Sequence, residues 1–144
     1  MNSRTSTRLI IGTIILVLVA IWIWQNLGET DSHSVEGSIR VVDGDTVEID
    51  GIYYRAVNYD TPETAHRAEC DSERERGERA TERLRQFAGD GLEIIPIGRQ
   101  DRYERELANF LTSDGQNIAD VFAAEGIAVY WGDGPEDWCT ERWR

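Results

Sequence analysis

The chain has 144 residues, 40% of them hydrophobic, and a formal net charge of −12 at pH 7. This length allows one domain with a hydrophobic core and short additions, but not two domains. All 15 basic residues are arginines and only two histidines are present, which excludes a GxxxxGK phosphate loop, a Schiff-base lysine, a Ser-Lys dyad and a zinc site of the usual spacing.

An apolar run near the N-terminus indicates a membrane-directed segment. Residues 1–8 carry two arginines and no acid, and residues 9–24 carry no charge. Together with the next three residues, this run is long enough to span a hydrocarbon core of about 30 Å. Trp22 and Trp24 stand where an interfacial belt lies, and a small-residue cleavage site is missing. We predict an uncleaved transmembrane anchor at residues 9–27; a cleaved signal and a secreted protein are the alternative.

The arginines of the N-terminus predict the orientation of this anchor. By the positive-inside rule, residues 1–8 stay in the cytoplasm and the rest of the chain lies outside it, in the periplasm or on the cell surface. Residues 28–35 are polar and lack periodicity, so we expect a linker there. Residues 36–144 then form the folded domain. No protein partner is implied, and we expect a monomer.

Three short strands are expected at the start of the folded domain. Residues 39–42 and 46–49 are separated by an Asp-Gly-Asp turn. Asp50-Gly51 is a strong two-residue hairpin signal before residues 52–57. Strands joined by such tight turns form an antiparallel meander.

A long helix is expected next. Residues 72–75 fit a capping box. Apolar side chains follow at helical spacing, at Ala80, Leu84, Phe87 and Ala88. Gly77 costs this helix about 1 kcal/mol unless another segment packs closely against it.

The remaining elements complete a small α+β fold that is mainly β. Residues 92–97 predict a fourth strand, which Pro96 confines to a sheet edge because proline has no amide donor. Residues 105–112 predict a fifth strand. A second helix follows, with Asn117 as its cap and Gly126 as its end. We therefore expect a small, partly open five-stranded barrel with two to three flanking helices.

The two cysteines are Cys70, before the first helix, and Cys139, near the C-terminus. The anchor predicts an oxidising compartment, where two cysteines most simply form one disulfide. Two buried thiols are the alternative.

Residues 55–64 bring together one guanidinium and two carboxylates that could bind an ion or act in catalysis. Strict strand alternation places Arg55 and Asp60 on opposite faces, because they are five residues apart. They can share a site only if the regular strand ends near Tyr59. In that case Asp45 and Asp60 offer hard oxygens to a cation such as Ca²⁺, Arg55 offers a bidentate fork, and the Glu63 carboxylate remains free.

This collection of groups suits hydrolysis of a phosphodiester. A divalent cation and guanidinium groups neutralise charge on the phosphorus oxygens, while a carboxylate orients or deprotonates the attacking water. A second guanidinium is expected from residues 101–105, which also supply an aromatic face for a base.

Three motifs in order, at residues 41–47, 55–64 and 101–108, closely resemble the staphylococcal nuclease family. The resemblance extends over about residues 38–131 and includes the spacing from arginine to aspartate. It implies an OB-fold barrel with flanking helices and Ca²⁺-dependent cleavage of DNA and RNA, with single strands favoured.

The resemblance also implies roles for individual residues. The calcium ligands would be the side chains of Asp45 and Asp60 and the carbonyl of Thr61. The groups that bind phosphate and act on water would be Arg55, Arg105 and Glu63. The groups that contact the nucleotide would be Arg102, Tyr103 and, by a looser match, Tyr130.

The chain departs from the family pattern beside Arg105. Glu104 stands where a glycine is expected, Glu106 where a small residue is expected, and Asn109 where an aromatic residue is frequent. Outside residues 1–8, 13 arginines face 27 acidic residues, whereas nonspecific nucleic-acid binding favours a positive surface.

Three functions therefore follow from the sequence. The first is a membrane-anchored, extracytoplasmic, Ca²⁺-dependent nuclease. The second is a weak or inactive OB-fold module that binds nucleic acid, a nucleotide or another anionic partner, which the acids flanking Arg105 favour. The third is a structural domain whose acids bind Ca²⁺ for stability alone.

Overall fold

The computed structural model describes residues 15–22, 34–133 and 137–140. The chain divides into two compact units, Met1–Ser32 and His33–Arg144. Residues 15–22 are helical. No helix within the described ranges is long and apolar enough to cross a membrane. The predicted cytoplasmic arm, most of the predicted anchor and most of the predicted linker lie outside the described residues.

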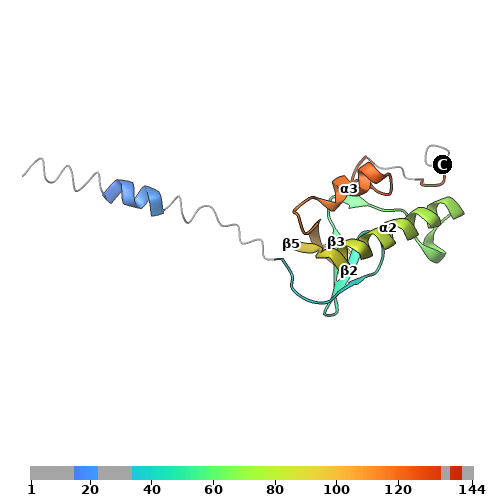
Figure 1. Cartoon of the computed structure of the whole chain (residues 1–144), viewed down its shortest axis with the longest axis horizontal. Coiled ribbons are helices and arrows are strands. Elements are labelled where there is room, and N and C mark those ends of the chain that lie inside the picture. Colours follow the sequence, from blue (N-terminus) through green and yellow to red (C-terminus); the bar gives the residue numbers. More distant parts are fainter. Residues whose placement is uncertain (1–14, 23–33, 134–136, 141–144) are drawn as a thin grey trace, which may run out of the picture. The chain divides into compact units, whose positions relative to one another are not determined.

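The second unit is built on a five-stranded mixed sheet (Figure 1). Its strands lie in the order β1, β2, β3, β6, β5; their bounds are β1 (Ile39–Val41), β2 (Thr46–Ile49), β3 (Ile52–Ala56), β5 (Glu93–Gln100) and β6 (Glu106–Leu111). The first three strands form the predicted antiparallel meander, and each later strand falls where the sequence predicts one. β3 and β6 pair in parallel, which makes the sheet mixed.

The sheet is open rather than a closed barrel, so the prediction of a barrel is confirmed only as far as its five strands and flanking helices. β1 and β5 form the two edges of the sheet. The segment before β1 reaches β5 through the Val35 amide, which donates to the Ile94 carbonyl at 2.9 Å. Closure would need a continuous ladder between these edges. Pro96 lies in edge strand β5, as expected from its missing amide donor.

Helix α2 (Asp71–Asp90) flanks the sheet and contacts β1 (Figure 1). The predicted capping box at residues 72–75 is wrong by two residues, because the Cys70 sulfur accepts the Glu73 amide at 3.4 Å and caps the helix. The apolar stripe is correct: Ala80 and Leu84 are fully buried. Gly91 ends the helix in the left-handed conformation, with φ of 103°.

Helix α3 (Ile118–Glu125) begins at the predicted cap Asn117, whose side chain accepts the Ala119 amide at 2.9 Å. It ends at the predicted Gly126. This short helix packs against β6 and completes the core beside Phe110.

A second, two-stranded sheet was not predicted from the sequence. It pairs β4 (Tyr59–Asp60) with β7 (Val129–Tyr130). Strands of two residues carry no periodic pattern, so only long-range contacts define them. The fully buried Tyr59 ring makes edge contacts with Phe110 and Phe122, at centroid distances of 6.4 and 5.6 Å. This packing anchors the segment between β3 and the 3₁₀ helix η1 (Ala65–Arg67).

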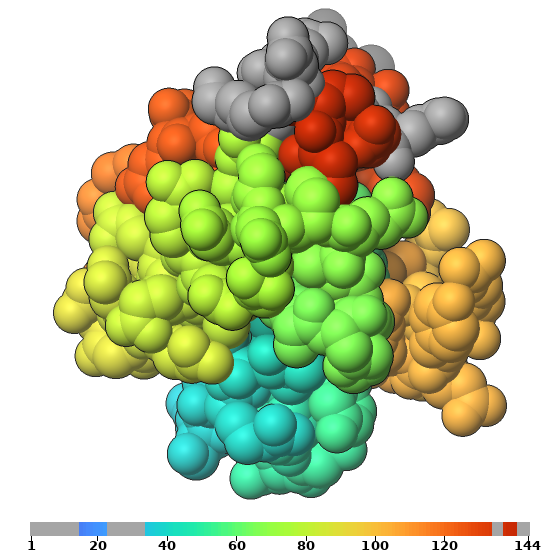
Figure 2. Space-filling view, turned by 90° about the vertical axis from the view of Figure 1, so that its right-hand side faces the viewer, coloured from blue at the N-terminus to red at the C-terminus, as the bar shows by residue number. Residues whose placement is uncertain are grey.

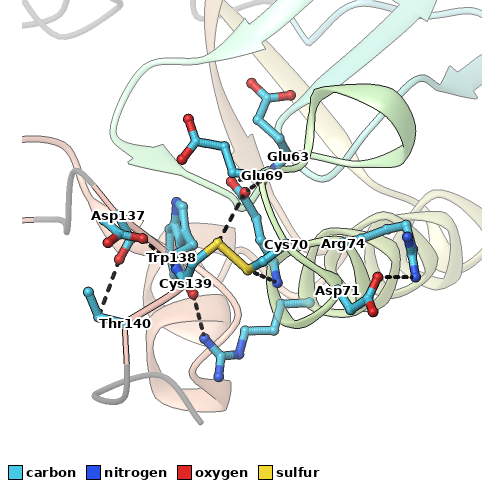
Figure 3. Close-up of a disulfide and its surroundings, with 11 residues drawn as sticks. Glu63, Glu69, Cys70, Asp71, Arg74, Asp137, Trp138, Cys139 and Thr140 are labelled. Carbon is cyan, nitrogen blue, oxygen red and sulfur yellow. Dashed lines mark hydrogen bonds and ion pairs between the residues drawn. A yellow bond between two sulfur atoms is a disulfide. The ribbon is translucent and has the colours of Figure 1, made fainter.

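The C-terminal segment is held against the start of α2 (Figure 3). Cys70 and Cys139 form a disulfide in the structure, the pairing that the sequence predicts. The buried Arg76 donates to the Trp138 carbonyl at 3.4 Å. In the space-filling view the red residues of this segment cover part of the green surface, while the gold β5 to β6 hairpin projects at one side (Figure 2).

Candidate functional site

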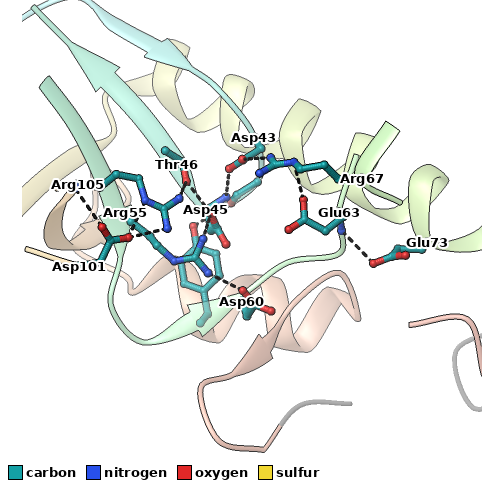
Figure 4. A network of polar contacts seen from close by, with 12 residues as sticks. Asp43, Asp45, Thr46, Arg55, Asp60, Glu63, Arg67, Glu73, Asp101 and Arg105 are labelled. Carbon is teal, nitrogen blue, oxygen red and sulfur yellow. Dashed lines mark hydrogen bonds and ion pairs between the residues drawn. The ribbon is translucent and has the colours of Figure 1, made fainter. Parts of the chain in front are cut away.

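The guanidinium of Arg55 lies between two carboxylates (Figure 4). Nη1 donates to Asp45 Oδ1 at 3.0 Å, and Nη2 donates to Asp60 Oδ1 at 2.6 Å. Strand β3 ends at Ala56, before Tyr59 begins β4, so the strict alternation that would separate Arg55 from Asp60 is broken. The condition stated from the sequence is therefore met, and three predicted site residues come together.

Asp45 is fixed from several directions in the turn between β1 and β2. Its carbonyl accepts the Ala56 amide at 2.9 Å, and its Oδ1 accepts the Thr46 hydroxyl at 2.7 Å. The preceding Gly44 packs tightly, since a Cβ there would lie 2.9 Å from two side-chain atoms of Thr61. This close approach shows that the Thr61 side chain packs against the turn that carries Asp45.

Burial and neighbouring charges shift the pKa values of Asp45 and Arg55. Burial raises the pKa of Asp45 to about 8, an effect that Arg55 opposes and Asp43 increases. Burial alone would lower the pKa of Arg55, but Asp45 and Asp60 raise it above its ordinary value. Burial is therefore the main reason that Asp45 holds its proton more tightly than an ordinary aspartate.

Arg105, the second predicted phosphate-binding arginine, is held by Asp101. Its Nε and Nη2 donate to Asp101 Oδ2 at 2.7 and 2.6 Å. Burial would raise the pKa of Asp101, but the hydrogen bonds from Arg105 and from backbone amides hold it below its usual value. Arg105 Nη1 also lies 3.4 Å from the Thr46 hydroxyl, which bonds Asp45. Thr46 thus connects the two arginine clusters.

The acids that flank Arg105 in sequence are not the ones paired with it. Glu106 accepts a hydrogen bond from Gln100 at 2.7 Å. Glu104 is exposed and has a φ of 62°, a left-handed conformation that favours glycine. The expected glycine at position 104 therefore has a structural reason. Within the described residues, Arg105 pairs with Asp101 and not with either flanking acid.

Glu63 lies on the other side of the cluster (Figure 4). Arg67 Nε donates to its Oε2 at 3.0 Å, while Arg67 Nη2 donates to Asp43 Oδ2 at 3.2 Å. Burial raises the pKa of Glu63, and Arg67 opposes that rise. A carboxylate with a raised pKa is a better general base near neutral pH.

Arg55, Glu63 and Arg105 line one cleft of about 1040 Å³, whereas the predicted calcium ligands Asp45, Asp60 and Thr61 are not among its lining residues. Its charged lining comprises two carboxylates and five arginines: Glu63, Asp101, Arg55, Arg67, Arg99, Arg102 and Arg105. Its aromatic lining comprises Tyr53, Tyr103 and Trp131. The cleft therefore concentrates positive charge on a domain whose total charge is negative.

Arg67, Arg99 and Trp131 were not predicted as site residues. Arg99 and Trp131 carry no motif, and only the fold brings them to the cleft. Trp131 is 62% exposed, and the Arg55 guanidinium carbon lies 5.9 Å from its ring centroid. Arg105 has an equivalent neighbour in Tyr103, at 5.5 Å. Each predicted phosphate-binding arginine thus has an exposed aromatic ring beside it.

The predicted nucleotide contacts have different positions. Tyr103 lines the cleft and is 63% exposed, and Arg102 lies over its ring at 4.7 Å. Tyr130 is not among the residues that line the cleft. Its hydroxyl donates instead to Asp120 of α3 at 2.7 Å. The neighbouring Trp131 lines the cleft instead.

Asp45, Asp60 and Thr61 offer oxygen donors of the kind that a hard cation binds. The hydrogen bonds to Arg55 and Thr46 use only Oδ1 of Asp45 and Oδ1 of Asp60, which leaves Oδ2 of each carboxylate for a ligand bond. Carboxylate and carbonyl oxygens are the donors that Ca²⁺ prefers. Cys70, Glu73 and Cys139 also gather closely, but their sulfurs form the disulfide, so this group does not fit a metal site.

The α+β fold and the arginine-rich cleft define a domain suited to binding phosphate groups. A family model described as staphylococcal nuclease homologue matches residues 54–138. The chain therefore belongs to the staphylococcal nuclease family, as the sequence motifs predicted. A comparison with curated proteins finds no match.

Proposed function

We propose that this protein is a membrane-anchored, extracytoplasmic, Ca²⁺-dependent nuclease that hydrolyses phosphodiester bonds of DNA and RNA. The observation that carries the proposal is the convergence of Arg55, Arg105 and Glu63 on one cleft, beside Asp45 and Asp60. Membership of the family supports a nucleic-acid substrate.

The two arginines bind the scissile phosphate. Their guanidinium forks suit phosphate oxygens, and partial burial strengthens each charge-assisted hydrogen bond. Ca²⁺ held by Asp45, Asp60 and the Thr61 carbonyl would add positive charge for the phosphoryl oxygens and would neutralise the carboxylates that Arg55 pairs with. Arg55 and Arg105 then stabilise charge that develops in the transition state.

Glu63 acts on the attacking water. Its carboxylate is half exposed on the cleft, so water reaches it directly. Arg67 holds one oxygen, Oε2, and the other is available to accept a proton or a hydrogen bond from water. General-base catalysis of this kind contributes about 10²- to 10⁴-fold to a rate.

The exposed rings of Tyr103 and Trp131 favour a single-stranded substrate. A base can stack on each ring only after it has left a duplex, and such stacking contributes about 1–3 kcal/mol per base. The positive cleft attracts the backbone locally, whereas the acidic remainder of the domain repels it. Binding should therefore be weak and sensitive to salt.

The location rests on the sequence. The apolar run at residues 9–24, with arginines before it, supports an anchor at residues 9–27 that leaves the nuclease domain outside the cytoplasm. The Cys70–Cys139 pair suits an oxidising compartment. We expect a monomer, which light scattering in detergent would check.

A binding module without turnover is the second candidate. It is favoured by the pairing of Arg55 and Arg105 with internal carboxylates, because a phosphate has to compete with Asp45, Asp60 and Asp101 for these donors. This candidate predicts saturable binding of oligonucleotides without cleavage.

A digestion assay separates the two. The full chain in detergent is incubated with single-stranded DNA or RNA, with Ca²⁺ or with excess chelator. The nuclease predicts cleavage that needs Ca²⁺ and falls about 10²-fold or more in Glu63→Gln. Glu75→Gln, an exposed carboxylate on α2, is the matched control. Absence of Ca²⁺-dependent cleavage, or full activity in Glu63→Gln, would reject the proposal.

A further inference from the structure

The buried carboxylate of Glu73 has no role in the chemistry described so far. Glu73 lies in the first turn of α2 and is 5% exposed, although it carries no arginine partner among its observed contacts. Burial of a carboxylate is costly unless its oxygens accept good hydrogen bonds. Its position therefore calls for an explanation.

Both oxygens of Glu73 accept backbone amides of the segment that carries Glu63, and Figure 4 shows the contact with Glu63. Oε1 accepts the Glu63 amide at 3.3 Å, and Oε2 accepts the Glu69 amide at 2.7 Å. One buried side chain thus fixes the segment at Glu63 and again after η1. Hydrogen bonds to a charged acceptor are about twice as strong as neutral ones.

The same segment also touches α2 at Gly77, one helical turn after Glu73. A Cβ at Gly77 would lie 2.6 Å from the Pro62 carbonyl oxygen and 2.5 Å from the Glu63 carbonyl oxygen. The backbone on both sides of the Glu63 amide is therefore in contact with α2. This close approach explains a glycine inside a long helix.

The contact between the Glu63 side chain and Arg67 is a weaker restraint. Both side chains are about half exposed, and exposed ion pairs contribute about 0–1 kcal/mol. The position of Glu63 therefore depends on its backbone more than on this ion pair. Glu73 is the side chain that holds this backbone.

We propose that Glu73 is a positioning residue, which holds the backbone at Glu63 so that the Glu63 carboxylate meets the attacking water. The proposal rests on the nuclease function. Glu73 does not touch the substrate; it acts through the two amides. If Glu73 can accept only one of the two amides, the Glu63 backbone moves and kcat falls. KM stays unchanged, because Arg55, Arg105 and the aromatic residues of the cleft keep their positions.

The test compares Glu73→Gln with Glu75→Gln in the full chain in detergent. Glutamine keeps the size of the side chain but offers one acceptor oxygen to two amides. We expect Glu73→Gln to lose about 10-fold or more in kcat with KM within about 2-fold, whereas Glu75→Gln is unchanged. Glu73→Asp, which keeps the charge but shortens the reach, should fall between them.

Hydrogen exchange supplies a measurement that needs no turnover. In Glu73→Gln, amides of a peptide covering residues 61–70 should exchange about 10-fold faster, while amides of α3 keep their wild-type rates. Wild-type exchange in that peptide together with wild-type kcat would overturn the proposal. So would a uniform rise in exchange across the domain, which indicates general destabilisation. If the wild type does not cleave at all, the nuclease function fails, and exchange alone decides whether Glu73 holds the segment.

Discussion

Arg55 donates to Asp45 and, through its other terminal nitrogen, to Asp60, so one guanidinium joins the two predicted calcium ligands. Replacing Arg55 with methionine leaves the buried Asp45 unpaired. Without this partner Asp45, whose pKa burial already raises to about 8, stays protonated at neutral pH and loses a hydrogen bond, so we expect a loss of about 1–3 kcal/mol in unfolding free energy without Ca²⁺, and abolished cleavage. Because the carboxylates then lack their internal cation, added Ca²⁺ should raise the melting temperature more in Arg55→Met than in the wild type.

Arg55→Lys is the control for charge. Lysine keeps one positive charge but cannot form the two-pronged contact, so stability should recover more than activity does. Thermal melts and cleavage rates at several Ca²⁺ concentrations measure both effects. Absence of Ca²⁺ stabilisation in both wild type and Arg55→Met would argue against a metal site at Asp45 and Asp60.

Glu104 is held at a φ of 62°, a conformation that costs a residue with a Cβ about 1 kcal/mol. Glu104→Gly should therefore raise the unfolding free energy by up to about 1 kcal/mol. Glu104→Gln removes the charge but keeps the Cβ, so it should leave stability near the wild-type value. Urea denaturation of the three proteins separates strain from charge; equal stabilisation by both variants would assign the effect to charge.

Gly77 and Gly89 lie on the same helix but in different surroundings. A Cβ at Gly77 would lie 2.5 Å from the Glu63 carbonyl oxygen, whereas nothing lies within 4 Å of one at Gly89. We expect Gly77→Ala to destabilise by about 1–3 kcal/mol despite the better helix propensity of alanine. Gly89→Ala should instead stabilise by up to about 1 kcal/mol. Chemical denaturation measures both, and the same sign for the two changes would contradict the prediction.

Trp131 lines the cleft and Tyr130 does not. Trp131→Ala should raise KM for single-stranded DNA about 10-fold, since loss of one stacking platform costs about 1–3 kcal/mol. Tyr130→Phe removes only the hydroxyl bonded to Asp120 and should leave KM unchanged. Steady-state kinetics on one oligonucleotide decides between the two positions; the reverse pattern would restore Tyr130 as the nucleotide contact.

The Cys70–Cys139 bond closes a loop with a sequence separation of 69 residues. Replacing both cysteines with serine should cost about 4 kcal/mol on the chain-entropy account. A reducing agent should lower the wild-type melting temperature toward that of the double variant and leave the double variant unaffected. Insensitivity of the wild type to reductant, with two titratable thiols, would mean that the bond does not form.

Local sequence patterns predicted the positions of most strands, turns and helix ends. The Asp50-Gly51 hairpin, the edge position of Pro96 and the caps at Asn117 and Gly126 all lie where the sequence placed them. Each depends on a few neighbouring residues, because turn conformation and helix capping are local properties. The predicted cap of the first helix was wrong: the capping box predicts Ser72 as the N-cap, whereas Cys70 is the N-cap in the structure.

By itself the sequence determined which groups are available: two arginines, Asp45, Asp60 and Glu63, in an order that belongs to one nuclease family. Tertiary structure alone decided how they are held. The break between β3 and β4 turns Arg55 toward Asp60, and parallel pairing of β3 with β6 places Arg105 near Thr46. Contacts between distant segments have no local pattern, which is why Trp131 and Glu73 emerged only from the fold.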